Sequence, residues 1–380
     1  MSAGPRVLVV HNRYRIEGGE ERSVDLQLDA MAAAGIEHAL FERRSSDASK
    51  PAAARAMLRG SHQPAELAAA VEHADADVVH AHNTVPLIGP GGLAAARAAG
   101  AAVVLHLHNV RIFCATGFGE RDGGPCRRCR GRNTLPGLVL NCRKSVPEAV
   151  TYAVALNRHQ PLLFESVDRF VTPSAAARDE LAARGLPAER VEVLRHYLPE
   201  GFFAERSGAA EGAYALVASR LSPEKGIVDA VAACASAGVP LRIAGEGPER
   251  ERLARAAQGA DVTFLGRLPA AEVREQLAGA AMVLMPSRYH EFSPFSALEA
   301  MAAGVPVVAT AMGGLPELLG EGGCTTPGVP GLFAERVAEL WSDAAARGAK
   351  GDALLARARE RHSRERYTQD LRRLYESVRR

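Results

Sequence analysis

The sequence predicts an α/β protein of two domains, each with a doubly wound parallel sheet covered by helices. Three observations support this fold class. The chain has 380 residues, which exceeds the usual size of one domain. Short runs of β-branched residues alternate along most of it with Ala-rich stretches of helical length. Residues 199–212 combine Pro, Gly and charge without periodicity, and we interpret them as a linker between the two domains.

Composition limits the classes of function. Basic and acidic residues number 46 and 44, and the resulting net charge of +2 gives no reason to expect nucleic-acid binding. Hydrophobic residues make up 47% of the chain, enough for two cores without crosslinks. The N-terminal residues lead directly into an apolar run, without a signal-peptide pattern or a membrane-spanning stretch. We therefore predict a cytoplasmic protein.

The first domain is predicted to span residues 1–198. Its first strand is Val7 to Val10, and the following loop contains Gly18 and Gly19 before a helix that Gly35 terminates. Glycine allows a backbone to approach a bound group closely, but a plain turn explains a Gly-Gly pair equally well.

Two further strands of this domain, 77–82 and 103–108, both end in histidine followed by asparagine. The usual role of a histidine at a strand end is a structural hydrogen bond. His80, His82 and His106 are interpreted in this way.

Four of the six cysteines lie in an insertion that spans residues 111–145. Their spacing is C-x11-C-x2-C-x12-C, at Cys114, Cys126, Cys129 and Cys142. A C-x2-C pair with further cysteines in a Gly- and Arg-rich loop is typical of a structural zinc ion held by four thiolates. A reducing compartment disfavours disulfides, and free or paired thiols remain the alternative.

The second domain is predicted to span residues 213–360, and its first strand leads into SRLSPEKG. There Arg220 and Lys225 stand five positions apart around a Ser-Pro turn. A guanidinium and an ammonium just beyond the carboxyl end of a parallel strand favour phosphate binding. Two solvated cations in a turn are the simpler interpretation.

Residues 282–310 are predicted to form a β-α-β unit. Two apolar runs flank a helix expected from Pro294 to Ala303, with Ser293 as N-cap and Gly304 as C-cap. Free N–H groups and the helix dipole make the start of this helix a site for an anion.

Two acids accompany this helix, Glu291 before it and Glu299 within it, with seven residues between them. A carboxylate one to two turns from a phosphate site is placed to accept hydrogen bonds from sugar hydroxyls. We expect neither acid to be buried in the core. The stretch therefore favours a nucleotide site, with two solvated acids as the alternative.

The segment EFSPFSALEAMAAGVPVVAT, together with the R-x4-K pair Arg220 and Lys225, resembles the nucleotide-sugar signature of retaining glycosyltransferases of family 4. The resemblance implies the GT-B fold, in which two Rossmann-like, doubly wound domains face one another across a cleft. It implies that the two cations hold the donor diphosphate, that Glu299 binds the ribose and that Glu291 lies against the donor sugar. Residues 361–380 would form a helix that crosses back to the first domain.

The same resemblance implies further site residues. His108 would contact the donor sugar near the transferred carbon. Backbone and small side chains would complete the donor site at Gly18, Gly19, Gly245, Gly266, Leu268, Ser293, Phe295 and Ser296. Candidates to face the acceptor are Arg13, Tyr14, Asn83 and Asn109. The four-cysteine insertion resembles that of a subset of the family. Where many relatives have a glycine after the first acid, this chain has Ser293 and Pro294.

The expected activity is transfer of a sugar, with retained anomeric configuration, from a UDP- or GDP-sugar to a hydroxyl of a glycan, a lipid-linked molecule or a natural product. No catalytic metal or organic cofactor is expected, because Arg220 and Lys225 supply the positive charge and no D-x-D motif is present. The alternatives are a nucleotide-sugar epimerase or hydrolase, a nucleotide-binding module without turnover, and a zinc-dependent interaction protein. The basic residues of 43–59 give a weak signal for peripheral contact with the inner face of a membrane.

Overall fold

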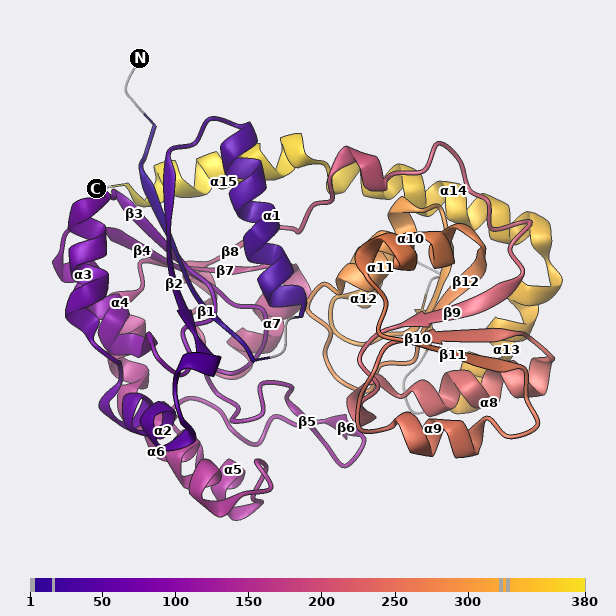
Figure 1. Ribbon diagram of the computed structural model, residues 1–380, viewed down its shortest axis with the longest axis horizontal. Helices are drawn as coiled ribbons and strands as arrows, with labels where there is room; N and C mark the ends of the chain where they lie inside the picture. The colour runs from indigo at the N-terminus through magenta and orange to yellow at the C-terminus, as the bar shows by residue number, and fades with distance from the viewer. Residues whose placement is uncertain (1–3, 16–17, 321–323, 326–328, 380) are drawn as a thin grey trace. The chain divides into compact units, whose positions relative to one another are not determined.

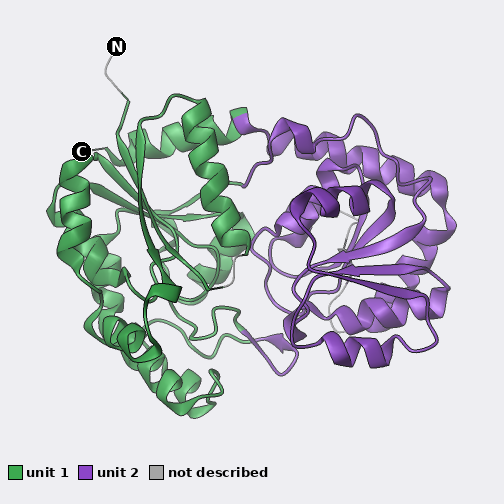
Figure 2. Ribbon diagram, viewed as in Figure 1, with its two compact units in different colours: residues 1–119, 126–195, 365–380 green, residues 120–125, 196–364 purple. Residues whose placement is uncertain are grey.

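The computed structural model describes residues 4–15, 18–320, 324–325 and 329–379. It divides into two compact units (Figure 2). Unit 1 comprises residues 1–119, 126–195 and 365–380, and unit 2 comprises residues 120–125 and 196–364. Each unit is a parallel sheet with helices packed on it, as the alternating sequence pattern predicts, and the fold class is confirmed (Figure 1).

The sheet of unit 1 has six parallel strands in the order β2-β1-β3-β4-β7-β8. They are β1 (Val7–Arg13), β2 (His38–Arg44), β3 (Val78–Ala81), β4 (Ala102–His106), β7 (Arg169–Thr172) and β8 (Val191–Val193). Residues of β3 and β4 are buried throughout, which explains why these strands read as nearly continuous apolar runs. Strand β1 continues past its predicted end at Val10, because pairing with β2 extends to Arg13 and Arg44.

Helices pack on the sheet of unit 1, and one short helix lies within the cysteine insertion. They are α1 (Gly19–Ala33), α2 (Lys50–Arg59), α3 (Pro64–His73), α4 (Gly89–Ala98), α5 (Leu135–Val139), α6 (Val146–Ser166), α7 (Ala175–Ala182) and α15 (Arg364–Val378), with short 3-10 helices η1 (Ser45–Asp47) and η2 (Ala188–Arg190). Helix α15, the last of the chain, lies beside α1 (Figure 1). Tyr375 of α15 and Gln27 of α1 are hydrogen-bonded to each other and to His80 of β3. The C-terminal helix is therefore part of unit 1.

The cysteine insertion contains a hairpin of β5 (Glu120–Arg121) and β6 (Gly124–Pro125) and the short helix α5. Arg184, at the end of α7 and 1% exposed, fastens this insertion to the domain. Its guanidinium donates to the carbonyl oxygen of Cys126 at 2.7 Å and to Glu180 at 2.7 Å. A buried arginine thus satisfies backbone carbonyls in a loop that has few strands to do so.

The sheet of unit 2 also has six parallel strands, in the order β11-β10-β9-β12-β13-β14. They are β9 (Tyr214–Ala218), β10 (Leu241–Ala244), β11 (Val262–Gly266), β12 (Ala280–Met285), β13 (Val307–Thr310) and β14 (Cys324–Thr325). Its helices are α8 (Ile227–Ala237), α9 (Arg250–Ala256), α10 (Ala270–Ala278), α11 (Phe295–Ala302), α12 (Leu315–Leu319), α13 (Pro330–Ser342) and α14 (Ala344–Arg361), with 3-10 helices η3 (Glu200–Phe202) and η4 (Pro223–Lys225). Strands β9 and β12 are neighbours, so the loops that follow them meet at the carboxyl edge of the sheet.

Residues 199–212, interpreted as a linker from their composition, pack on unit 2. Ser207 Oγ donates to the carbonyl oxygen of Gly304 at 2.6 Å, and Arg347 Nε donates to that of Ala209 at 2.9 Å. Ala209 is fully buried. Among the described helices, none is both long and apolar enough to cross a membrane.

Candidate active site

The loop after β9 in unit 2 presents the two predicted cations. Helix η4 ends at Lys225, and Gly226 follows with a φ of +63°, where an added Cβ would lie 2.1 Å from the carbonyl oxygen of Pro286. Glycine is required here, because the loop after β12 passes directly over the turn. Arg220, whose side chain is half exposed, donates to Glu224 at 2.7 Å.

Glu224 is a buried acid that the motif search did not single out. Burial would raise the pKa of its carboxyl, but hydrogen bonds from Ser222 Oγ and the backbone, with the charge of Arg220, hold the pKa below its usual range. Glu224 therefore stays ionised and fixes the guanidinium of Arg220. Its position between the two motif cations was the only signal for it in the sequence.

Lys225 and Glu291 form one ion pair that joins the two motifs. Lys225 Nζ lies 2.7 Å from Glu291 Oε1 and 3.0 Å from Tyr289 Oη. Tyr289 and Ser287 also donate to the carboxylate, at 2.6 and 2.7 Å. Burial opposes a charge on Lys225, but Glu291 and Tyr289 raise the pKa of its ammonium, so Lys225 remains protonated. No sequence motif indicated the roles of Tyr289 and Ser287.

The expectation that neither motif acid is buried is wrong. Glu291 is 3% exposed and Glu299 is 8% exposed. Glu291 is buried because three donors, Ser287 and Tyr289 from its own loop and Lys225, satisfy its carboxylate oxygens, which offsets the loss of water. Glu299 lies on α11, which is buried along most of its length.

Helix α11 begins one residue later than predicted. Pro294 rather than Ser293 is its N-cap, and no side chain caps it. The N–H groups of its first turn therefore have no side-chain cap, which suits an anion at this end. The helix ends at Ala302 with Ala303 as C-cap, so Gly304, predicted as the C-cap, follows one residue later with a φ of +68°.

Three glycines hold the loops of this site at close quarters. An added Cβ would lie 2.2 Å from the carbonyl oxygen of Glu291 at Gly313, and 1.9 Å and 2.2 Å from those of Ser219 and Leu221 at Gly245 and Gly247. All three have a positive φ. Gly245 thus packs against the backbone of Ser219, next to Arg220, and this close contact alone explains the glycine without a ligand.

The other predicted donor residues surround these loops. The Phe295 ring is buried and stacks on His196 with centroids 4.5 Å apart, so only its backbone is available to a ligand. Ser293, Ser296 and Leu268 are half-buried. Gly266 ends β11 with a φ of +70° and accepts a hydrogen bond from Gly245 N–H at 2.7 Å.

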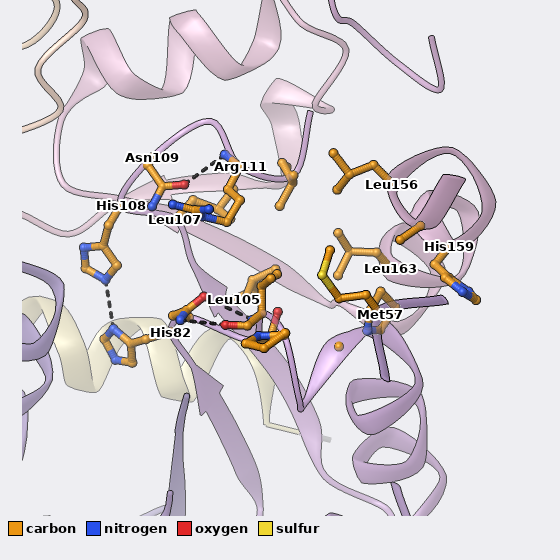
Figure 3. A pocket seen from close by; sticks show the side chains of 18 of the residues that line it. Met57, His82, Leu105, Leu107, His108, Asn109, Arg111, Leu156, His159 and Leu163 are labelled. Carbon is orange, nitrogen blue, oxygen red and sulfur yellow. Dashed lines mark hydrogen bonds between the residues drawn. The ribbon is translucent and has the colours of Figure 1, made fainter. Parts of the chain in front are cut away.

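In unit 1, histidines gather at the ends of β3 and β4. His82 Nδ1 and His108 Nε2 lie 2.9 Å apart (Figure 3). The rings of His106 and His108 stack with centroids separated by 4.3 Å. Burial lowers the pKa of His80 to about 3, so this ring is neutral at physiological pH. His108, the predicted sugar contact, is thus oriented by His82 and His106.

A pocket opens beside His108 within unit 1 (Figure 3). Much of its wall is apolar, from Met57 on α2 to Leu156 and Leu163 on α6. Its polar residues include Tyr14, Glu20, Asn109 and Arg111, from the β1 and β4 loops and the first turn of α1. Burial raises the pKa of the Glu20 carboxyl to about 7. The pocket suits a ligand with an apolar part beside a hydroxyl group.

The predicted acceptor-side residues separate into two groups. Tyr14, Asn83 and Asn109 line this pocket, whereas Arg13 is absent from its lining. Arg13 ends β1 and forms ion pairs with Asp25 and Glu42.

Gly18 and Gly19 lie at the start of α1, where Gly18 N–H donates to Glu21 at 2.8 Å. The same carboxylate accepts from Tyr14 N–H at 2.9 Å. The Glu21 carboxylate therefore binds the backbone N–H groups of Tyr14 and Gly18, in the loop where the glycines were predicted to approach the donor.

The four cysteines of the insertion are thiols in the structure rather than disulfides. Burial raises the pKa of Cys129 to about 11, and charge on its three cysteine neighbours adds to this effect, so the four side chains form one group. The ligand atoms of His80, His82 and His106 lie within 4.8 Å of one another. Within the described ranges, no three of the cysteine sulfur atoms are gathered in this way.

Comparison with known proteins relates both units to glycosyltransferases. The family described as Glycosyltransferase Family 4 matches residues 17–196, and that described as Glycosyl transferases group 1 matches residues 213–343. The glycogen synthase of Mycobacterium tuberculosis is 33% identical over 224 residues, which cover 55% of this chain and 51% of that protein. A 2-deoxystreptamine glucosyltransferase of Streptomyces kanamyceticus is 33% identical over 174 residues, 43% of this chain and 42% of its own. The chain spans about half the length of these curated relatives.

Solved structures extend the likeness over the whole fold. HepE of Anabaena in complex with UDP-glucose superimposes with a TM-score of 0.67 at 18% identity, covering 98% of this chain and 100% of that one. The sucrose-phosphate synthase of Thermosynechococcus elongatus gives a TM-score of 0.72 at 16% identity, covering 98% and 99%. These structures have the GT-B fold, and so does this chain.

Proposed function

We propose that this chain, whose two units match glycosyltransferase family models and which has the GT-B fold, is a retaining enzyme that transfers a sugar from a nucleotide-diphosphate sugar to a hydroxyl acceptor without a catalytic metal. The observation that carries the proposal is the ion pair of Lys225 and Glu291, 2.7 Å long and buried at the carboxyl edge of the unit 2 sheet. It brings the cation motif and the acid motif into one site next to the start of α11.

In the proposed reaction, Arg220, Lys225 and the N-terminus of α11 bind the donor diphosphate. The bond between the anomeric carbon and the diphosphate oxygen breaks, and the two cations stabilise the charge that the leaving group acquires. The acceptor oxygen forms its bond to the anomeric carbon on the same face, and its proton passes to a phosphate oxygen. Glu299 accepts from the ribose hydroxyls and Glu291 from the sugar. The configuration at the anomeric carbon is thereby retained.

Two donor series are consistent with relatives. HepE of Anabaena was solved with UDP-glucose, and a relative from Mycobacterium tuberculosis, 39% identical over 105 residues, is described as GDP-mannose-dependent. The pocket beside His108 favours an acceptor that carries an apolar group next to its reactive hydroxyl. Glu20, on the polar part of that pocket, would accept from this hydroxyl.

Ligand-induced thermal stabilisation by UDP, GDP, ADP and dTDP and their sugars, with and without EDTA, tests the proposal. A ligand at about a hundred times its Kd adds roughly 2.7 kcal/mol of stability. One nucleotide series should stabilise the protein equally in EDTA. Lys225→Met should lose this stabilisation and Lys350→Met, at an exposed lysine of the same unit, should keep it. The absence of stabilisation by every nucleotide would contradict a donor site.

Turnover with the stabilising donor separates transfer from the alternatives. Arg220→Ala should reduce turnover about a hundredfold or more, because it removes a charge from the leaving phosphate. Consumption of donor at the same rate with and without any acceptor would indicate a hydrolase or epimerase instead.

A structural zinc ion in the cysteine insertion is a second, separate proposal. Four thiols from one insertion have the chemistry of a Zn²⁺ site, and binding would draw their sulfur atoms closer together. Metal analysis of protein purified under reducing conditions should find zinc, of which Cys126→Ser removes about one equivalent per chain. Less than roughly a tenth of an equivalent per chain would reject this proposal.

A further inference from the structure

Three buried histidines share one face of the unit 1 sheet. His80 lies on β3 and His82 two residues further, so their side chains point the same way. The register pairs His80 with Val104, which places His106 opposite His82. None of the three is more than 2% exposed. The three imidazole rings therefore lie together in one buried cluster.

The three rings are close enough to share an ion. One ligand atom of each lies within 4.8 Å of the other two. The rings stack, with centroids separated by 4.9 to 5.6 Å and interplanar angles of 8 to 27°, so they must turn for their in-plane nitrogen atoms to converge on one ion. Two histidines two residues apart on a strand and a third on the neighbouring strand supply three neutral nitrogen ligands, and a fourth position stays open for water. We propose that His80, His82 and His106 bind a divalent transition-metal ion of the Zn²⁺ type.

In two of these rings a hydrogen bond holds the Nδ1 atom, as is common in histidines that bind a metal through the other nitrogen. His80 Nδ1 lies 2.8 Å from Tyr375 Oη, which accepts from Gln27 Nε2 at 3.1 Å. Gln27 Nε2 also lies 3.0 Å from His80 Nδ1, so protein groups occupy this nitrogen and Nε2 is the atom left to bind an ion. His82 Nδ1 lies 2.9 Å from His108 Nε2, so its Nε2 is likewise the ligand atom. Metal-binding histidines commonly hold their second nitrogen in this way.

The pocket of unit 1 supplies the path by which the ion enters. His82 and His106 both line it, and so does Glu20, whose carboxylate reduces the cost of a positive charge there. Imidazole ligands select zinc, copper, nickel or cobalt rather than magnesium or calcium, which prefer oxygen. The site is therefore distinct from a Mg²⁺ site at a diphosphate, and it lies in the other unit from Arg220 and Lys225.

An ion at this position would hold His82 and, through the hydrogen bond, His108. Its effect on sugar transfer rests on the proposed function, whereas its binding does not. Because His82 and His106 line the pocket, an ion bound to them would compete with an acceptor there. Zn²⁺ should thus inhibit transfer by raising the KM for the acceptor, with little change in donor binding.

Titration of the reduced, metal-free full chain with Co²⁺ tests binding directly. Four-coordinate Co²⁺ with nitrogen and water ligands absorbs in the visible region, and thiolate ligands add strong near-ultraviolet charge-transfer bands, so this site is separable from the cysteines. We expect a nitrogen-type band that saturates at one equivalent. His106→Asn should weaken its formation at least tenfold, and His159→Asn, which changes a pocket histidine outside the cluster, should not.

Tyr375→Phe keeps all three ligands and removes only the orienting hydroxyl, so it remains informative if the histidine variants do not fold. It should weaken Co²⁺ about tenfold and require about tenfold more Zn²⁺ for the same inhibition. A titration without the nitrogen-type band, or a band that neither His106→Asn nor Tyr375→Phe changes, would overturn the metal site. Normal Co²⁺ binding without any sugar transfer would contradict the proposed function alone.

Discussion

The ion pair of Lys225 and Glu291 makes a quantitative prediction about unit 2. The side chains are 15% and 4% exposed, and their charged atoms are 2.7 Å apart. At an effective dielectric constant of about 20, their attraction is roughly 6 kcal/mol before the cost of desolvation. Removing one partner of such a pair usually costs about 3–5 kcal/mol, because the other charge stays buried. Tyr289 and Ser287 still donate to Glu291, so we expect Lys225→Met to cost about 3 kcal/mol.

Urea unfolding followed by tryptophan fluorescence measures this loss in the correct unit. The single tryptophan of the chain, Trp341, packs against the core of unit 2. Lys225→Met should lower the free energy of unfolding by about 3 kcal/mol and the melting temperature by roughly 6–12 °C. Lys350→Met, at an exposed position, should change it by less than about 0.5 kcal/mol.

The double variant decides whether the loss comes from the pair. Glu291→Gln removes the buried carboxylate, so Lys225→Met should cost at least about 2 kcal/mol less in that background. Additive losses within about 0.5 kcal/mol would show that the two motifs are energetically independent. That result would refute the view that the cation motif and the acid motif are energetically coupled.

Two further predictions concern single residues. The pKa of Glu20 is raised in the folded protein from its ordinary value to about 7. Folding therefore has its full contribution from this group only below the ordinary pKa, where Glu20 is protonated, and the contribution is lost as the pH rises through 7. Glu20→Gln should stabilise unit 1 in thermal unfolding by about 1–2 kcal/mol at pH 8, a figure reduced for the partial exposure of Glu20, and by much less at pH 5. Glu72→Gln, at an exposed acid, should show no such dependence on pH. Gly313→Ala must displace the Glu291 carbonyl and should weaken nucleotide-sugar binding about tenfold in calorimetry, whereas Gly331→Ala, in open space, should not.

The sequence predicted those parts of the site that depend on local rules. Helix α11 begins within one residue of its predicted start, because proline and the following apolar pattern define a helix end locally. Lys225 lies in a turn after a strand, as the Ser-Pro signal indicated. Gly304 follows α11 in the left-handed conformation that favours glycine.

Interactions that depend on the path of two loops were not predictable in the same way. Burial of Glu291 depends on Tyr289 and Ser287 turning back toward it, which residue spacing does not determine. Arg184 and Glu180 form an ordinary i, i+4 pair in sequence, yet the same guanidinium also binds the carbonyl of Cys126 in the insertion. Such contacts between distant segments follow from tertiary packing and leave no local pattern.

The ion pairs of the proposed donor site must change partners when a diphosphate binds. Arg220 is paired with Glu224 and Lys225 with Glu291, so the formal charges of these four residues sum to zero before any donor binds. In the proposed complex a diphosphate draws Lys225 toward itself, so Glu291 keeps the hydrogen bonds from Tyr289 and Ser287 but loses its paired charge in a buried position. The hydroxyls of the transferred sugar would then donate to Glu291, and a free nucleoside diphosphate lacks that sugar. Glu291→Gln should accordingly weaken the nucleotide sugar while leaving the nucleoside diphosphate unchanged or bound more tightly in calorimetry; equal weakening of both would place Glu291 at the phosphates instead.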